Sequence, residues 1–276
     1  MAGMLRHLID QDLSLVFKYL ITIGASGLTQ QSDDVRRYGK AKSGLIERQF
    51  MLGVVQTADG MPIYHEVFDG NTAEAPTLQP TLKKVLARYP HIRRLVVVAD
   101  RGLLSLDNIE ALAKLHVAAA RPLEFILAVP GRRYGEFVDL LAPMSPRLAQ
   151  AREEVVEEAQ WQGHRLVVAH NPVRAAEQTQ ERLARIHALQ QRADQLTGKL
   201  DAQDEGKVQR GRKLSDSGAK ARFFHEVSDA HLARIIKVDL QSDLFTYQID
   251  EAALARAQLM DGKLMLITNV RDMTPV

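Results

Sequence analysis

A carboxylate ends a short apolar run near the middle of the chain. Residues 95–99 are all apolar and three of them are Val, and Asp100 follows with Arg101 and Gly102 behind it. A run this short and this uniformly apolar predicts a strand that is buried on both faces. The catalytic residues of open α/β sheets lie at the carboxyl ends of such strands, so Asp100 is a candidate catalytic and metal-binding residue, and Arg101 beside it is a candidate DNA contact. A helix cap or an ion pair with Arg101 explains the same spacing equally well.

A second polar group lies between residues 29 and 43, in a turn-rich stretch that interleaves an aromatic ring with cations. Its members are Arg36, Arg37, Tyr38, Lys40 and Lys42. These residues precede a strand that we expect to run beside the active edge, so their cations would hold phosphates close to the metal site there, with the ring stacked on a base. A solvated charged loop is the alternative interpretation of the same residues.

Asn71 and a later basic segment give weaker indications of the same kind. Asn71 stands in a loop ahead of a predicted helix, where it either contacts DNA or caps the helix. Residues 207–222 hold six basic side chains against the single acidic residue Asp216. That composition fits a DNA-tracking arm and fits a basic linker equally well.

Composition limits the classes of function that remain. The chain has 276 residues, of which 46% are hydrophobic and 25% charged, as is ordinary for a globular protein. Its formal net charge is only +2, so any affinity for nucleic acid must come from local basic patches. The absence of cysteine excludes disulfides, thiol nucleophiles and cysteine-bound metals, and makes a cytoplasmic location the expected one.

The sequence also argues against a membrane or nucleotide partner. Residues 13–23 resemble a targeting signal, but Asp10, Asp12 and Lys18 interrupt or precede them. No apolar run approaches the roughly 18 residues of a membrane span. Neither a Gly-x-Ser-x-Gly elbow nor a phosphate-binding glycine loop occurs.

The elements that must position Asp100 follow from the periodicity of the apolar residues. We expect strands at 13–23, 49–56, 62–68, 95–99 and 124–129, and helices at 75–89 and 104–115. Three strands, a helix, a parallel strand, a second helix and a further strand is the order of the RNase H-like fold. The predicted fold class is therefore α/β, with an RNase H-like mixed sheet and flanking helices.

The pattern of apolar and polar residues changes beyond Pro130. We expect residues 1–130 to form the first part of the core, 131–243 a largely helical insertion with a few strands, and 244–276 the rest of the core. Pro172 opens a long helix whose apolar residues recur every three or four positions, as in an amphipathic arm. They are Leu183, Ile186, Leu189, Ala193, Leu196 and Leu200. Shorter strands are expected at 165–169, 232–238, 245–249 and 263–268.

Six fragments, in this order and spacing, resemble the DDE-type transposases of bacterial insertion sequences. They are residues 38–42, 49–55, 60–63, 65–74, 97–102 and 261–269. The resemblance implies an RNase H-like nuclease core that binds the terminal repeats of an element and cuts and joins their DNA. It also implies two divalent ions, Mg²⁺ or Mn²⁺, because one ion activates the attacking oxygen and the other stabilises the leaving one. Both metals prefer carboxylate oxygens, which in this family come from Asp, Asp and Glu.

Only one of those three acids has a counterpart in this sequence. Asp100 matches the second Asp. The first is expected at the end of a Val-Phe-x-Asp pattern, but the chain has Tyr19 there, after Val16-Phe17-Lys18, and a phenol is neutral at pH 7. The family's Glu lies on a helix after the strand at 263–268, and no Glu follows that strand. The resemblance therefore predicts a truncated, degenerate transposase whose metal binding is doubtful and whose DNA cleavage is defective.

Two other interpretations of the sequence remain open. A non-catalytic remnant would bind DNA, form a homodimer, or pair with and inhibit a full-length transposase. An unrelated metal-dependent nuclease would instead recruit Asp12, Asp69 or Glu66 beside Asp100. Without the family's last helix, one face of the sheet is expected to be apolar and exposed.

Overall fold

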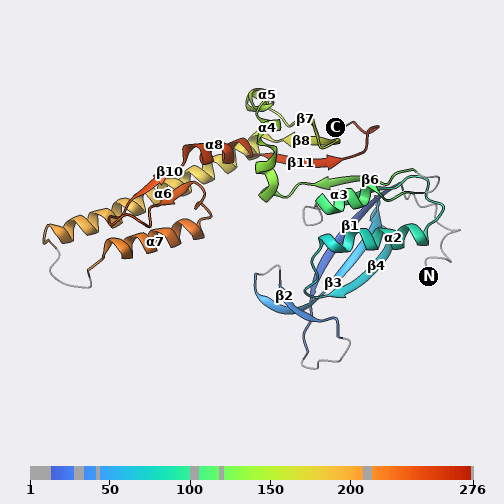
Figure 1. Cartoon of the computed structure of the whole chain (residues 1–276), viewed down its shortest axis with the longest axis horizontal. Coiled ribbons are helices and arrows are strands. Elements are labelled where there is room, and N and C mark those ends of the chain that lie inside the picture. The colour runs from blue at the N-terminus through green and yellow to red at the C-terminus, as the bar shows by residue number, and fades with distance from the viewer. Residues whose placement is uncertain are drawn as a thin grey trace. The chain divides into compact units, whose positions relative to one another are not determined.

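The computed structural model describes residues 14–27, 34–41, 44–99, 106–117, 121–207 and 213–274, without the side chains of residues 106 and 107. The chain forms two compact units, which are described separately (Figure 1). The first comprises Met1–Arg133, Val156–Val168 and Leu264–Val276, and the second comprises Tyr134–Val155 and Ala169–Lys263.

A mixed sheet forms the centre of the first unit. Its five core strands are β1 (Leu15–Gly24), β3 (Ile46–Thr57), β4 (Pro62–Asp69), β5 (Val96–Ala99) and β6 (Glu124–Ala128). They lie in the order β4-β3-β1-β5-β6, in which β3 runs antiparallel to β1 while β5 and β6 run parallel to it. This mixed, RNase H-like arrangement confirms the predicted fold class. It places the end of the apolar strand β5 directly beside the central strand β1.

Four more strands bring the sheet to nine within the part of the chain that the structure describes. The order continues beyond β6 with β11 (Lys263–Thr268), β8 (His164–His170) and β7 (Val155–Trp161), and β2 (Arg37–Lys40) pairs with β3. The strand β7 was not predicted, because the adjacent charged residues Glu157 and Glu158 interrupt the apolar alternation that marks a strand.

One face of the core strands is covered by helices. Val16, Lys18 and Leu20 of β1 are buried on this face, and Lys18 reaches η1 (Ala75–Thr77). The helices α2 (Leu78–Arg88) and α3 (Leu106–Ala113) follow, and Figure 1 shows both of them over the same side of the sheet. Leu78, Leu82 and Val85 of α2 are fully buried, as the predicted amphipathic helix requires.

The opposite face of the core strands is apolar and half exposed. Phe17 and Tyr19 stack with their ring centroids 6.3 Å apart, and Tyr19 is 40% exposed. Ile21 is exposed to a similar extent, and Val54 and Val98 are partly buried. This agrees with the expectation of an incompletely covered sheet face.

The second unit is built around the long helix α6 (Pro172–Asp204). Asn171 caps it by accepting a hydrogen bond from the Arg174 backbone N–H, and Pro172 occupies the first helical position, where its missing N–H costs nothing. The predicted apolar seam is buried from Ile186 to Leu196, whereas Leu183 is exposed. The other elements of the unit are η4 (Gly131–Phe137), which begins in the first unit, α4 (Val138–Leu141), α5 (Ser145–Gln150), α7 (Asp216–Asp229), β9 (Ile236–Val238), β10 (Tyr247–Ile249) and α8 (Glu251–Leu259).

The strand predicted at 232–238 is correct only for its last three residues. Residues 232–235 instead form a turn, in which the Ile235 backbone N–H donates to the carbonyl oxygen of Leu232. Leu232 and Ile235 are both buried in the core made by α6 and α7, so tertiary packing overrides the local β-propensity of this apolar segment.

The Asp261-Gly262 pair has a structural role in the second unit. Gly262 has φ +67°, and a Cβ atom there would lie 2.4 Å from the carbonyl oxygen of Asn171. Asp261 is buried and binds the Arg182 guanidinium through two contacts of 2.6 Å. Only glycine fits this close approach, so the motif holds the turn before β11 against the start of α6.

No helix in the described ranges is both long enough and apolar enough to cross a bilayer.

Candidate nucleic-acid interface

Several of the predicted site residues cannot be placed. Asp100, Arg101 and Lys42 lie outside the described residues, as do Asp10 and Asp12. The candidate catalytic edge is therefore described by its neighbours, the end of β5 and the adjoining part of β1.

The strand beside the end of β5 carries a buried cation and a phenol. Lys18 of β1 pairs in register with Ala99, the last residue of β5, and Tyr19 follows it. The Lys18 side chain is completely buried, and its ammonium donates a hydrogen bond of 2.6 Å to the Thr77 hydroxyl. Burial lowers the pKa of Lys18 to about 8, against the opposing effect of the Glu74 and Glu66 carboxylates. The strand β1 contains no acidic residue at all.

The described residues do not fit the pair of divalent ions that the family resemblance implies. Such a site needs several carboxylates, and no group of three His, Asp or Glu residues that could hold a metal exists among the described positions. The ammonium of Lys18 and the phenol of Tyr19, beside the end of β5, supply no carboxylate oxygen.

Of the alternative acids, Asp69 lies away from the end of β5 and Glu66 lies nearer to it. Asp69 pairs with Phe50, which pairs with Ile23, so it lies level with a residue five positions beyond Lys18, or about 16 Å along β1. Glu66 pairs with Gly53, which pairs with Leu20, only two positions beyond Lys18, and its carboxylate binds Lys84 of α2. The position of Asp69 therefore does not support its recruitment beside Asp100, and the Glu66 carboxylate is already bound by Lys84.

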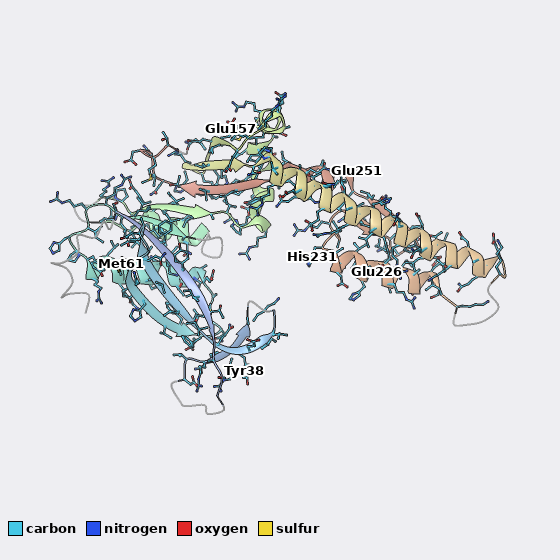
Figure 2. The ribbon with its side chains drawn as sticks, turned by 180° about the vertical axis from the view of Figure 1, so that it is seen from behind. Tyr38, Met61, Glu157, Glu226, His231 and Glu251 are labelled. Atoms are coloured by element: carbon cyan, nitrogen blue, oxygen red, sulfur yellow. The ribbon has the colours of Figure 1, made fainter. Side chains whose placement is uncertain are left out.

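The predicted DNA-binding residues lie instead on a two-stranded ribbon. The strand β2 pairs antiparallel with the first four residues of β3, from Arg37 opposite Gln49 to Lys40 opposite Ile46. The Ala41 backbone N–H donates to the carbonyl oxygen of Leu45 and closes the turn. Because β1 and β4 end level with Gln49 and Phe50, the ribbon extends beyond both of them (Figure 1). Figure 2 shows Tyr38 on this ribbon, at the end of the sheet opposite the Met61 turn.

The base of the ribbon is a close contact between two glycines and one amide. The buried Gln49 side chain donates to the Gly70 carbonyl oxygen at 2.8 Å, and the Gly70 N–H donates to Val35. A Cβ atom on Gly70 would lie 1.8 Å from the Gln49 carbonyl oxygen, and one on Gly39 would lie 2.7 Å from that of Gly70. Two motifs of the family resemblance, at 38–42 and 65–74, therefore meet here.

One acidic residue holds two of the nearby arginines. The Asp34 carboxylate accepts hydrogen bonds of 2.7–2.9 Å from Arg36 and one of 3.1 Å from Arg48, and its side chain is only 7% exposed. The hydrogen bonds from Arg36 hold the pKa of Asp34 well below its usual range. Arg36 was predicted to bind DNA, but in this structure it is occupied by Asp34 and fixes the ribbon's first strand.

Three predicted residues are brought together with their polar groups open to solvent. Tyr38 is 63% exposed, and Lys40 and Asn71 are also exposed. Asn71 is not a helix cap, because Glu74 occupies the N-cap position of η1. Arg37 is exposed as well, in a solvent-accessible pair with Asp69 at 3.6 Å. Tyr38 and Lys40 lie on one face of β2, Arg37 lies on the other face, and Asn71 follows Gly70 at the base of the ribbon.

Two apolar residues of the ribbon were missed by the sequence reasoning. Leu45 is 64% exposed and Ile46 is 76% exposed. The predicted strand begins at Gln49, whereas β3 begins at Ile46, because β2 supplies hydrogen-bonding partners that the local pattern does not reveal. The only signal for them in the sequence is that two adjacent apolar residues stand among cations.

The ribbon is farther from the end of β5 than the sequence suggested. Lys18 lies level with Ala99, and Gly24 lies level with Gln49 at the base of the ribbon. These six residues of β1 span about 20 Å. The prediction that the basic residues lie close to the metal site is therefore wrong for the ribbon base.

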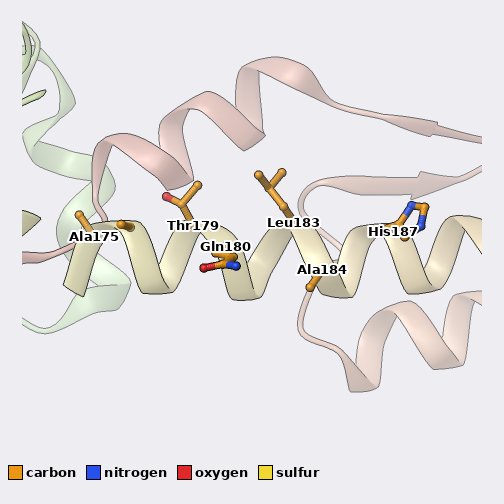
Figure 3. A pocket seen from close by; sticks show the side chains of 7 residues that line it. Ala175, Thr179, Gln180, Leu183, Ala184 and His187 are labelled. Carbon is orange, nitrogen blue, oxygen red and sulfur yellow. The ribbon is translucent and has the colours of Figure 1, made fainter. Parts of the chain in front are cut away.

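The basic segment 207–222 is exposed in part. Lys207, Lys213 and Arg222 are exposed, whereas Lys220 is buried and donates to the carbonyl oxygen of Ser242, and residues 208–212 lie outside the described residues. A hollow of about 650 Å³ lies along α6 in the second unit (Figure 3). It is lined by Ala175, Ala176, Thr179, Gln180, Leu183, Ala184 and His187, so it is mostly apolar and presents no carboxylate.

Comparisons with known proteins add little to this description. No protein-family model matches the sequence, and no curated protein matches it. Among solved structures, the chain is similar to a piggyBac transposase in a synaptic complex with hairpin DNA, with a TM-score of 0.38 and 13% sequence identity. The match covers 56% of this chain and 30% of the transposase chain. At this TM-score the similarity assigns neither a family nor a function.

Replacing the buried lysine should stabilise the protein at neutral pH. We expect Lys18→Met to raise the free energy of unfolding at pH 7 by about 1–3 kcal/mol, because the ammonium no longer has to leave water. The folded pKa lies below the unfolded one, so the wild type itself gains stability as pH rises from about 8 to about 10.5. The advantage of the variant should therefore vanish near pH 10.5, as measured by urea unfolding across this range.

Lys83→Met is the matched control, since Lys83 is an exposed lysine of α2. It should change stability by less than about 1 kcal/mol and show no comparable trend with pH. A Lys18→Met protein that is markedly less stable than the wild type at pH 7 would contradict this account of the buried ammonium.

Proposed function

We propose that this chain is a DNA-binding protein with a transposase-type RNase H-like core, and that it binds DNA without cutting it. The observation that supports this proposal is the rigid ribbon of β2 and β3, which carries the exposed Tyr38 and Lys40 and has the exposed Asn71 at its base, next to Gly70. The terminal repeats of an insertion-sequence element are the proposed target, in keeping with the sequence fragments that resemble such transposases.

The ribbon is one of two basic stretches of the chain. Residues 34–48 contain five basic and two acidic side chains, a net charge of +3, while the whole chain carries only +2. A polyanion is therefore attracted to the ribbon, as it is to the basic segment 207–222. β-Ribbons of this kind enter the grooves of duplex DNA.

Each exposed group of the ribbon has a contact to make on DNA. The Lys40 ammonium can neutralise a phosphate, the Tyr38 ring can pack on a sugar or a base, and the Asn71 amide can donate and accept hydrogen bonds. The fixed base at Gly39, Gln49 and Gly70 means that little conformational entropy is lost when these groups bind.

The absence of cleavage is proposed from the strand beside the end of β5. Cleavage by two metal ions needs several carboxylates at one place, and β1 presents Lys18 and Tyr19 there. We therefore propose that neither Mg²⁺ nor Mn²⁺ is held tightly at this edge. Tyr19 stands where the related transposases have their first Asp, and this difference alone supports the proposal.

A second candidate function is pairing with another copy of the chain or with a full-length transposase. The half-exposed apolar face around Tyr19 and Ile21 favours it, because a sheet face of this kind is usually covered. Pairing and DNA binding are compatible.

DNA binding should depend on Lys40 and Tyr38. We expect Lys40→Ala to reduce the slope of log affinity against log salt by about 1, because one fewer phosphate is neutralised. Tyr38→Ala should weaken binding roughly tenfold through lost stacking, with an unchanged salt slope. Fluorescence anisotropy with a labelled duplex of the element's terminal repeat, titrated at several salt concentrations, measures both effects.

Lys199→Ala, at an exposed lysine of α6 in the second unit, serves as the control and should bind as the wild type does. Affinity that is independent of salt, or equal in all three variants and the wild type, would refute the proposed interface.

Cleavage should be absent. In a nicking assay on a supercoiled plasmid that carries the terminal repeat, with Mg²⁺ or Mn²⁺, the wild type should produce no more nicked product than Asp100→Ala, because β1 supplies no carboxylate. Metal-dependent nicking by the wild type that disappears in Asp100→Ala would show that the protein is an active nuclease and would overturn the non-catalytic part of the proposal.

A further inference from the structure

The tip of the ribbon presents its largest apolar side chains to water. Ile46 is the most exposed large apolar residue in the described part of the chain, and Leu45 beside it is exposed nearly as much. Exposing two neighbouring aliphatic side chains has a cost in water, so a tip of this composition indicates a binding partner.

The residues around the tip decide which partner fits. Ile46 lies directly opposite Lys40, and Arg48 lies opposite Tyr38. Residues that face each other across two strands project from the same face, with Cβ atoms about 5 Å apart. This face therefore carries an ammonium immediately beside an exposed isoleucine, and a phenol two positions along the strand.

A purely apolar partner does not suit such a surface. A hydrophobic protein groove or a lipid core that buried Ile46 would also have to remove water from the neighbouring Lys40 ammonium. A DNA duplex offers both environments within a few ångströms, since its base steps are apolar and its phosphates are anionic. The net charge of +3 over residues 34–48 agrees with this occupant.

We propose that Leu45 and Ile46 form a wedge that inserts into a base step of duplex DNA and kinks it. This inference rests on the proposed DNA binding and specifies how the ribbon engages the duplex. Apolar residues inserted from the minor groove partly unstack a base step and bend the duplex by about 20–90°.

The architecture of the ribbon suits this role. Two strands about 4.8 Å apart, with their side chains, are wider than a minor groove of about 6 Å, so the groove has to open for the ribbon to enter, and a kink opens it. Unstacking costs a few kcal/mol per step, so the wedge has to be held firmly. The Gln49 amide, the close contacts of Gly39 and Gly70 and the ion pairs of Asp34 hold the base of the ribbon.

The test compares the wild type with Leu45→Ala/Ile46→Ala on a duplex of the terminal repeat that carries dyes at both ends and 2-aminopurine at successive positions. The wild type should shorten the distance between the dyes and raise 2-aminopurine fluorescence at one step. The double variant should do neither. Its affinity should fall less than about tenfold and its salt slope should stay unchanged, because no cation is lost.

Leu240→Ala/Leu244→Ala is the matched control, since these leucines are similarly exposed in the second unit. It should bend DNA as the wild type does, and all three proteins should have the same melting temperature.

The outcomes separate the wedge from DNA binding itself. Salt-dependent binding without bending or unstacking, or equal bending by the double variant, overturns the wedge and leaves the proposed function standing. If the wild type does not bind the duplex, both fall. If sedimentation shows a dimer that only the Leu45→Ala/Ile46→Ala protein loses, while DNA is left straight, the tip is an interface between copies and the wedge is overturned.

Discussion

The ribbon depends on one close approach of two backbones. Gly70 lies so near the Gln49 carbonyl that any side chain at position 70 would collide with it, and the Gln49 amide then binds the Gly70 carbonyl oxygen. At this point β4 stops and β2 takes its place along the same edge of β3. Because the contact has no room for adjustment, the direction of the ribbon and the position of Asn71 are set together. The proposed binding of DNA by the ribbon depends on that rigidity.

The core beside the end of β5 packs around a buried lysine. Lys18 occupies the central strand there, and its ammonium is satisfied by Thr77 under the covering helix. A buried cation of this kind is costly, and apolar burial by Leu78, Leu82 and Val85 on the same side offsets the cost. Fold and function are separable properties of a chain, so this core supports the ribbon whatever chemistry the neighbouring edge performs.

The core strands were predictable because each carries its own signal. The apolar run at 95–99 and the alternation of β1 are read from a few neighbouring residues, and both strands lie where they were expected. Elsewhere, tertiary contacts override the local sequence pattern. Residues 232–235 have the pattern of a strand but form a packed turn. The ribbon is a second example. No local sequence pattern predicts that Gly39 and Gly70 are in contact, or that Asp34 binds the Arg36 guanidinium. The fold determines both kinds of contact: the ion pair between residues close in the sequence and the contact between residues far apart in it.

The central claim is that the ribbon of β2 and the start of β3 is the surface that meets DNA. Hydrogen–deuterium exchange of the whole chain, with and without the terminal-repeat duplex, measures this most directly. The account predicts slower exchange on DNA addition at residues 37–41 and 44–49 and around Asn71, with α6 and α7 unchanged. Slower exchange confined to the second unit, or no change anywhere at saturating DNA, would contradict it.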